Sequence, residues 1–424
     1  MAMSRLVDDR SPWASRIDSH RINKITISDI NNPFNRFTVL LQGREEIVCW
    51  LMKEGLLADT VKYDRCHVDC RLSVRERAIE GLVWRCPLRH EINCADTVFF
   101  AKSQLHLPDI INFLITYAEG QSLWRCSQVA GVGYGSTAVD WASFCRDLFV
   151  EYYAQHIRDE KFSGEVEIDE SLFGRRTKYH RGDPRGLKVW IFGLVERTTN
   201  RLKVFPVDRR DAATMIPIIQ QNVELGSTVI TDGWSAYQGL CSAGYTHYVV
   251  EHKRAFSCQC RDESGQLITI HTNRIEGAWK HAKEYFRRMN GTKVSQFESH
   301  LCELMWRWWD RTPRAEAILR LIKEFYSLTR PPVFTVGHPV FDIWSRQSSD
   351  SMEDSMSRMD SSEDEDNVEP TASTNTTELS DLSAAVCPPE CESAAQTSTA
   401  SRLSLKRQRT AVSVGFRHRL VSMS

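Results

Sequence analysis

The sequence predicts a multidomain protein of the α+β and α/β classes: a mixed sheet with flanking helices, after a smaller N-terminal region and before a disordered tail. Three observations predict this fold. Residues 163–290 alternate apolar strands with helical spacing, a cysteine-rich and helical region comes before them, and the composition changes after about residue 344. At 424 residues and 42% hydrophobic, the chain is long enough for two or three folded units.

These changes divide the chain into five parts. We expect a flexible N-terminus at 1–30, a helix and a cysteine-rich segment at 31–95, a helical region at 96–158, the mixed-sheet domain at 159–330, and a disordered tail at 345–424.

The tail is rich in serine and acidic residues. Between residues 350 and 392 it has 13 acidic residues and one basic residue, so it cannot bury enough apolar surface to fold. No apolar run of 18 residues and no signal-peptide core occurs, so we expect an intracellular protein without membrane contact. The basic run Leu405 to Arg409 favours the nucleus for a eukaryotic protein, although such runs are common in disordered tails.

The cysteine-rich segment runs from Cys66 to Cys94. In a reducing compartment, the 13 cysteines of the chain favour thiols and metal sites over disulfides. Four thiolates around one Zn²⁺ would order a segment with little apolar content, and buried structural thiols are the alternative. The predicted ligands are Cys66, Cys70, Cys86 and Cys94, with His67 and His90 as substitutes.

Residues 123–149 have the pattern of two helices around the glycine-rich "GVGYGS". We expect Ser136 or Thr137 to be the N-cap of the second helix. A helix-turn-helix that binds DNA and an ordinary helical hairpin both fit this pattern, and both readings stay open.

The mixed-sheet domain begins with three predicted strands, "GEVEIDES", "LKVWIFGLVER" and "RLKVFPV", which form an antiparallel meander. The stretch "DAATMIPIIQQNV" has helical spacing, and "STVITDG" is a fourth strand. A later helix contains "HTNRIEGAWKHAKEYFRR", with Ile275, Ala278, Trp279 and Ala282 as its apolar stripe.

Three acidic residues stand at particular places in this order. Asp169 ends the first strand, Asp232 ends the fourth, and Glu276 begins the late helix. If the first and fourth strands are neighbours, their ends meet at one edge, where a crossing helix would bring the third acid. Carboxylates so close would repel one another unless cations lay between them, and oxygen ligands favour Mg²⁺ or Mn²⁺. Two such ions support phosphodiester chemistry.

Each acid also has a plainer interpretation. Asp232 followed by Gly233 is good turn chemistry. Glu276 and Lys280 have the spacing of an ion pair on a helix. The three acids in this order favour the metal site.

Four stretches carry a resemblance to a known family. "EIDESLFGRRTKYHRG", "VWIFGLVER", "TDGWSAY" and "HTNRIEGAWKHAK", within about residues 160–312, resemble the catalytic domain of Merlin-type DDE DNA transposases and their bacterial insertion-sequence relatives. The resemblance implies an RNase H-like five-stranded mixed sheet, with Asp169, Asp232 and Glu276 as the metal-binding triad and Lys283 as a DNA contact. It also implies a zinc ribbon before this domain, although the spacing of Cys86 and Cys94 is unusually wide.

A basic segment follows Asp169. Beside a metal site, its side chains would hold DNA phosphates, because Arg and Lys supply the part of DNA affinity that does not depend on sequence. A solvated charged hairpin is the alternative. The predicted DNA contacts here are Arg175, Arg176, Lys178, Arg181 and Lys188.

The resemblance therefore implies a cut-and-paste transposase that uses two Mg²⁺ or Mn²⁺ ions to hydrolyse transposon ends and join the 3′-hydroxyl to target DNA. Its partners would be the terminal inverted repeats, target DNA and at least one further copy of the chain, since two ends are paired. A domesticated derivative that binds DNA without cleaving it is the alternative. Another nuclease of the same fold fits the acids but not the "TDGWSAY" and "HTNRIEG" blocks.

Overall fold

The computed structural model describes most of the chain between residues 24 and 326. The tail at 345–424 and the basic residues Arg175, Arg176, Lys178 and Arg181 lie outside the described residues. Only the backbone is described at 258–261, 267, 268, 294 and 295. The described ranges are 24–41, 43–96, 99–174, 188–250, 258–261, 267–289, 292 and 294–326.

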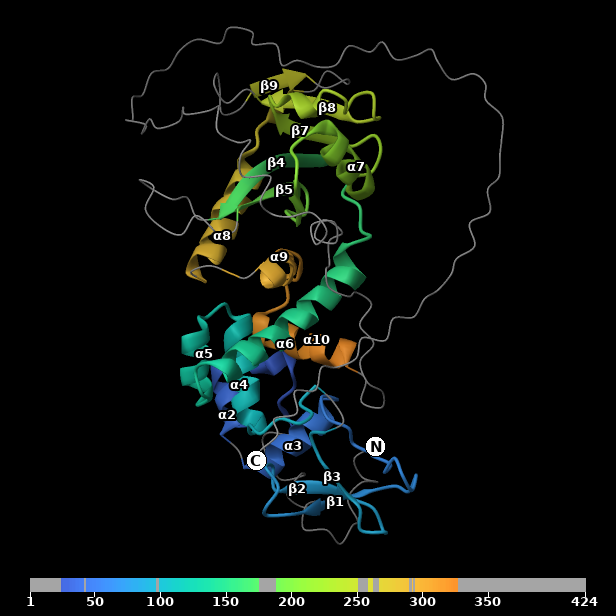
Figure 1. Ribbon diagram of the computed structural model, residues 1–424, viewed down its shortest axis with the longest axis vertical. Coiled ribbons are helices and arrows are strands. Elements are labelled where there is room, and N and C mark those ends of the chain that lie inside the picture. Colours follow the sequence, from blue (N-terminus) through green and yellow to red (C-terminus); the bar gives the residue numbers. More distant parts are fainter. Residues whose placement is uncertain are drawn as a thin grey trace, which may run out of the picture.

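The molecule is long, with a five-stranded sheet at the top of Figure 1, a layer of helices in the middle and a three-stranded sheet at the bottom. The five strands lie in the order β6-β5-β4-β7-β8. β4, β5 and β6 form the expected antiparallel meander, and β7 runs parallel to both β4 and β8. The strands are β4 (Glu165–Gly174), β5 (Lys188–Glu196), β6 (Leu202–Val207), β7 (Thr228–Asp232) and β8 (Thr246–Val250). The predicted mixed sheet is confirmed, and the predicted first and fourth strands are neighbours in it.

Helices flank this sheet. The N-cap of α7 (Ala212–Asn222) is Asp211, whose side chain accepts a hydrogen bond from the N–H of Thr214. The hairpin of β9 (Cys258–Arg261) and β10 (Leu267–Ile270) leads into α8 (Asn273–Arg288), which packs against β4 and β5. The predicted apolar stripe of α8 is buried and fixes the helix on the sheet. α9 (Val294–Trp309) packs against β6.

The middle layer joins the N-terminal helices to the end of the chain that the structure describes. α9 packs on α6, and α10 packs on α4 and α6, with Phe149 and Trp306 stacked at 4.2 Å between ring centroids. The hydrophobic core is therefore continuous across residue 158. The helices are η3 (Ser28–Asn31), α2 (Pro33–Leu40), α3 (Arg44–Lys53), α4 (Leu107–Ala118), α5 (Leu123–Ala130), α6 (Ser136–Tyr152), its π-helical continuation η4 (Tyr153–Ile157) and α10 (Arg314–Phe325).

Two expectations for this layer need correction. The predicted flexible N-terminus of residues 1–30 is too long. Ile25, Ile27 and Ile30 are buried, and the indole N–H of Trp50 donates a hydrogen bond to the carbonyl of Ile25 at 2.8 Å. The N-cap of α6 is Gly135 and not Ser136 or Thr137, which lie inside the helix. Glycine fits this position because its φ of 142° is strained for other residues.

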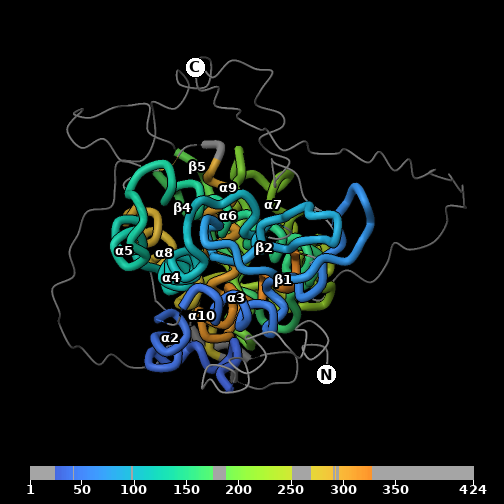
Figure 2. Tube along the Cα trace, turned by 90° about the horizontal axis from the view of Figure 1, so that it is seen from below, coloured from blue at the N-terminus to red at the C-terminus, as the bar shows by residue number. Residues whose placement is uncertain are grey.

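The small sheet at the other end consists of β1 (Arg71–Val74), β2 (Leu82–Arg85) and β3 (Glu91–Asn93), paired antiparallel in that order. Figure 2 views the molecule from this end, with α2, α3, β1 and β2 labelled. Among the described residues, no helix has the length and apolarity needed to cross a bilayer.

Candidate functional site

Asp169 lies in the middle of β4, because the strand continues to Gly174 beyond the predicted end. Its carboxylate faces α8, where the indole N–H of Trp279 donates to Oδ2 at 2.9 Å. The residue paired with Asp169 on β5 is Gly193, and a Cβ there would lie 2.5 Å from the Trp279 ring. This glycine therefore makes room for the indole that holds Asp169.

Asp232 is the last residue of β7, on the strand beside β4. Its Oδ1 accepts a hydrogen bond from the N–H of Trp234 at 3.1 Å, which fixes the carboxylate in a turn. Burial, followed by the charges of Glu170 and Asp232, raises the pKa of Asp169 to about 7. Asp169 and Asp232 therefore lie on neighbouring strands, and the negative charge of Asp232 acts on the carboxyl group of Asp169.

Glu170 is an acid of this site that the sequence reasoning missed. Tyr237, in the short helix η6 (Ser235–Tyr237), donates its hydroxyl to the Glu170 carboxylate. Burial raises the pKa of Glu170, and the charge of Asp232 raises it further. The sequence shows Glu170 directly after Asp169. Neighbouring side chains on a strand point to opposite faces, so the sequence offers no reason to place Glu170 beside Asp169.

Glu276 lies in the first turn of α8, and its Oε1 accepts a hydrogen bond from the Thr272 hydroxyl at 3.1 Å. Three or more side chains that could bind one metal ion should have their ligand atoms within about 4.8 Å of one another. Among the described side chains, this holds for a group of cysteine and histidine residues, described below, and not for the three acids. The carboxylates of Asp169, Asp232 and Glu276 therefore do not all lie within 4.8 Å of one another. Their all-oxygen donor set and accumulated charge nevertheless suit hard divalent cations.

The raised pKa of Asp169 predicts how the metal-free protein responds to pH. In the unfolded chain this carboxyl ionises near 3.8, whereas in the fold it keeps its proton up to about 7. Its contribution to stability is therefore lost progressively as pH rises between these values. In EDTA, we expect the gain in melting temperature from Asp169→Asn to be larger at pH 8 than at pH 5. An equal difference at both values would contradict this account.

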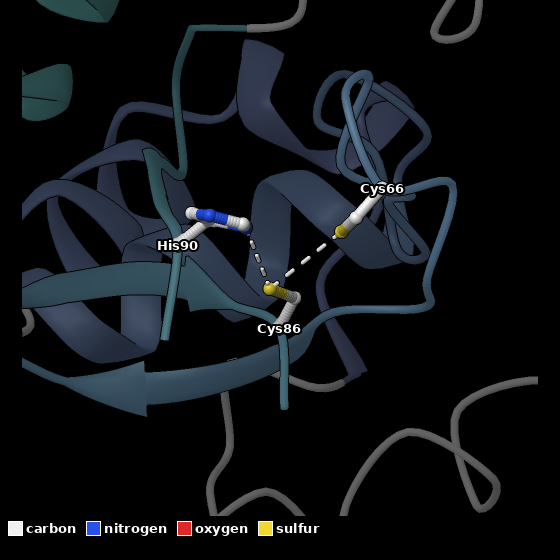
Figure 3. A group of neighbouring side chains, drawn as sticks. All are labelled: Cys66, Cys86 and His90. Carbon is white, nitrogen blue, oxygen red and sulfur yellow. Dashed lines mark hydrogen bonds between the residues drawn. The ribbon is translucent and has the colours of Figure 1, made fainter. Parts of the chain in front are cut away.

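The second candidate site lies where turns meet at the end of the small sheet. Cys86 Sγ lies 3.8 Å from Cys66 Sγ and 3.4 Å from Nδ1 of His90, and the three side chains point toward one another in Figure 3. Cys70 is buried just before β1. Its burial is the largest cause that raises its pKa, and the nearby Cys86 and Cys66 raise this pKa further. The ring of Tyr63 stacks on His90 at 4.5 Å and fixes the imidazole.

The structure does not bring Cys94 into this group. Its thiol is fully buried, and its pKa is raised to about 12 by burial and by the charges of Glu80 and Asp96, without any other cysteine. The group whose ligand atoms all lie within 4.8 Å of one another consists of Cys66, Cys86 and His90, so His90 stands beside Cys86 in a Cys-x3-His spacing. Cys70 lies near this group but outside that distance. The sequence had offered His90 only as a substitute.

Other cysteines follow the expectation in part. The thiols of Cys49, Cys126, Cys145 and Cys302 are free. Cys241 is disulfide-bonded and so departs from the general expectation that thiols and metal sites are favoured over disulfides.

Basic and aromatic side chains also lie on or near the elements that carry the acids. Lys188, the first residue of β5, and Lys283, on α8, are exposed. The guanidinium of Arg210 lies 3.7 Å from the Trp190 ring centroid and 5.0 Å from that of Trp234, which is 37% exposed. Arg210 was not predicted, because its place depends on two aromatic residues distant in sequence.

Residues 161–308 match the family described as the ISXO2-like transposase domain. A Haemophilus influenzae protein named "Uncharacterized transposase-like protein" is 32% identical over 96 residues, which cover 23% of this chain and 71% of that protein. The cryoEM structure of the simian T-cell lymphotropic virus intasome in complex with PP2A regulatory subunit B56 gamma aligns with 54% of this chain and 78% of its own. Its 11% identity and TM-score of 0.23 support no inference.

Proposed function

This chain belongs to the DDE transposase family, and we propose that it catalyses cut-and-paste transposition of DNA. The observation that carries the proposal lies inside the matched region. Asp169 and Asp232 stand on adjacent strands, and the charge of Asp232 raises the pKa of Asp169, while Glu276 begins the helix that packs on the same strand. The reaction would hydrolyse the element ends and join each 3′-hydroxyl to target DNA.

Asp169, Asp232 and Glu276 would hold two Mg²⁺ or Mn²⁺ ions, which in phosphodiester chemistry acidify the attacking hydroxyl and stabilise the leaving oxygen. The surrounding side chains hold these acids in place. Trp279 fixes Asp169, and Thr272 donates to Glu276. Burial and the neighbouring acids make Asp169 costly to ionise alone, which favours cation binding at this place.

DNA would lie along the exposed basic side chains near the acids. Lys188 and Lys283 would contact phosphates, together with Arg175, Arg176, Lys178 and Arg181 outside the described residues. We propose that α5 and α6 act as a helix-turn-helix on the terminal repeats. Two such ends would be held by at least two copies of the chain, in the nucleus if the source is eukaryotic.

Lys283→Ala is expected to weaken DNA binding about equally for all sequences, because the lysine contacts a phosphate. The slope of log affinity against log salt concentration should fall by about 1. Arg288→Ala is the matched control, since Arg288 on the same helix is already paired with Glu284. Fluorescence anisotropy at several salt concentrations measures both variants. An unchanged slope for Lys283→Ala would remove this residue from the DNA contacts.

We further propose that Cys66, Cys70, Cys86 and His90 bind one structural Zn²⁺ and make β1–β3 a zinc ribbon. Their sulfur and imidazole donors are those that Zn²⁺ prefers in closed structural sites. The ligands lie at the ends of strands, since Cys70 precedes β1, Cys86 follows β2, and His90 precedes β3. A bound ion would therefore hold together the turns of a sheet whose strands have only three or four residues.

The alternative is a domesticated protein that binds DNA without cutting it. A donor plasmid that carries the inverted repeats flanking the gene separates the two functions. A transposase excises the segment between the repeats and reinserts it, and Glu276→Gln abolishes both products. If the protein shifts the repeats in a gel but releases no segment in Mg²⁺ or Mn²⁺, the binding-only function replaces our proposal.

A further inference from the structure

Glu167 is a fully buried carboxylate on the strand that carries Asp169. The two residues are two positions apart on β4, so their side chains face the same side of the sheet, toward α8. A buried charge costs folding free energy unless it is paired and hydrogen-bonded. Glu167 is such a buried charge, two residues from the proposed metal ligand Asp169. Its partners explain why it lies there.

The Glu167 carboxylate binds the beginning of α8. Its Oε2 accepts hydrogen bonds from the backbone N–H of Arg274 at 2.8 Å and of Ile275 at 3.1 Å. The first N–H groups of a helix have no partner within the helix, and the helix dipole favours a negative charge there. The N-cap residue of α8, Thr272, makes no such side-chain bond. Glu167, more than 100 positions earlier in the chain, therefore caps the N-terminus of α8 in place of a local side chain.

Arg197 completes this arrangement from the turn after β5. Its Nε donates to Glu167 Oε1 at 2.7 Å, and its two terminal nitrogens reach Glu165 Oε2 at 2.8 Å and the His271 carbonyl at 2.6 Å. A further bond reaches the carbonyl of Thr269 at 3.3 Å. The guanidinium thus ties β4 to the segment that enters α8. The ring of His271 lies beside the same carboxylate, with Nδ1 3.3 Å from Oε1.

We propose that Glu167 and Arg197 are positioning residues that fix the first turn of α8 and thereby set the position of Glu276 relative to the strand that carries Asp169. This inference rests on the proposed function. One strand supplies both the first metal-binding acid and the carboxylate that anchors the helix of the third acid. The anchor holds residues 274 and 275, immediately before Glu276. A small shift of this turn would move Glu276 without unfolding the sheet.

The test is Glu167→Gln, which keeps the shape of the side chain but removes its charge. Glu196→Gln is the matched control. Glu196 is also buried, lies on the neighbouring strand, and accepts hydrogen bonds from the N–H of Ser163 at 2.9 Å and from the hydroxyl of Thr199. Ser163 and Thr199 both lie outside α8, so the two variants lose comparable interactions in different places.

Two readouts separate positioning from general stability. In metal-free protein, amide hydrogen exchange in the first turn of α8 should accelerate at least about tenfold in Glu167→Gln and stay unchanged in Glu196→Gln. With DNA and Mg²⁺, cleavage by Glu167→Gln should fall about 10-fold to 100-fold at fixed metal, because misplacement of about 1 Å has this effect. Its half-saturating Mg²⁺ concentration should rise, while DNA affinity stays the same.

Several results would overturn the inference. Equal exchange and equal cleavage in the two variants would reduce Glu167 to an ordinary stabilising residue. If Glu167→Gln does not fold, Arg197→Lys replaces it, because lysine keeps the charge but cannot bind the carboxylate and the two carbonyls together. Unchanged exchange in that variant would also overturn the inference. If the wild type does not cut DNA, the proposed function fails, whereas the exchange measurement still decides whether the first turn of α8 is anchored by Glu167.

Discussion

Asp232→Asn is expected to lower Mg²⁺-dependent strand cleavage by a factor on the order of 10³. The carboxylate would contribute to holding ions that supply several kcal/mol of transition-state stabilisation, and each 1.36 kcal/mol corresponds to about tenfold in rate. Asp169→Asn and Glu276→Gln should give losses of similar size. DNA affinity should stay nearly unchanged, because binding depends on basic side chains elsewhere. Single-turnover cleavage of labelled end DNA, with gel shifts on the same samples, measures both quantities.

Asp211→Asn is the matched control for this series. Asp211 is exposed near the same site, and its carboxylate caps α7 by accepting from the N–H of Thr214 at 2.9 Å. Asparagine is as good an N-cap, so cleavage should continue at the wild-type rate. Wild-type cleavage by Asp232→Asn, or a loss of DNA binding equal to the loss of cleavage, would contradict the assignment of the acids.

Cys86→Ser is expected to remove bound zinc and to unfold the small sheet. Cys86 lies between Cys66 and His90 in the group, so its loss opens the site. Structural Zn²⁺ binding in small domains amounts to roughly 10 to 16 kcal/mol, which these short strands cannot replace. The zinc content of Cys86→Ser, measured by metal analysis, should fall from one ion per chain to none. A protease should then cut this variant between residues 60 and 95.

The control for this experiment is Cys94→Ser. Cys94 is buried nearby but outside the group, so this variant should keep its zinc. His90→Ala should behave like Cys86→Ser. If Cys94→Ser loses zinc while His90→Ala keeps it, the four-cysteine site that the sequence first suggested is the correct one.

Local patterns predicted much of the fold around the acids. The alternation in "GEVEIDES" and the short apolar "STVITDG" identified β4 and β7. The metal-site hypothesis required these two strands to be neighbours, and they are. The apolar stripe of α8 was also read correctly, because helical spacing shows which face is buried. Such features depend on residues that are close in sequence.

The contacts around the acids could not be predicted in the same way. The bond from Trp279 to Asp169 and the space above Gly193 join residues more than 80 positions apart, so no spacing reveals them. The anchoring of α8 by Glu167 has the same origin. In the cysteine segment, the expectation of four thiolates favoured Cys94 over His90 despite the wide spacing, but the turn between β2 and β3 places the imidazole beside Cys86.

Cleavage at the element's own ends tests the central claim most directly. Purified wild-type protein is incubated with DNA that carries one terminal repeat and its flank, in Mg²⁺, and the products are mapped to the nucleotide. The proposed function predicts a strand break at the repeat boundary that leaves a 3′-hydroxyl, and no break with Asp232→Asn. A repeat that the wild-type protein binds but leaves intact in both Mg²⁺ and Mn²⁺ would contradict it.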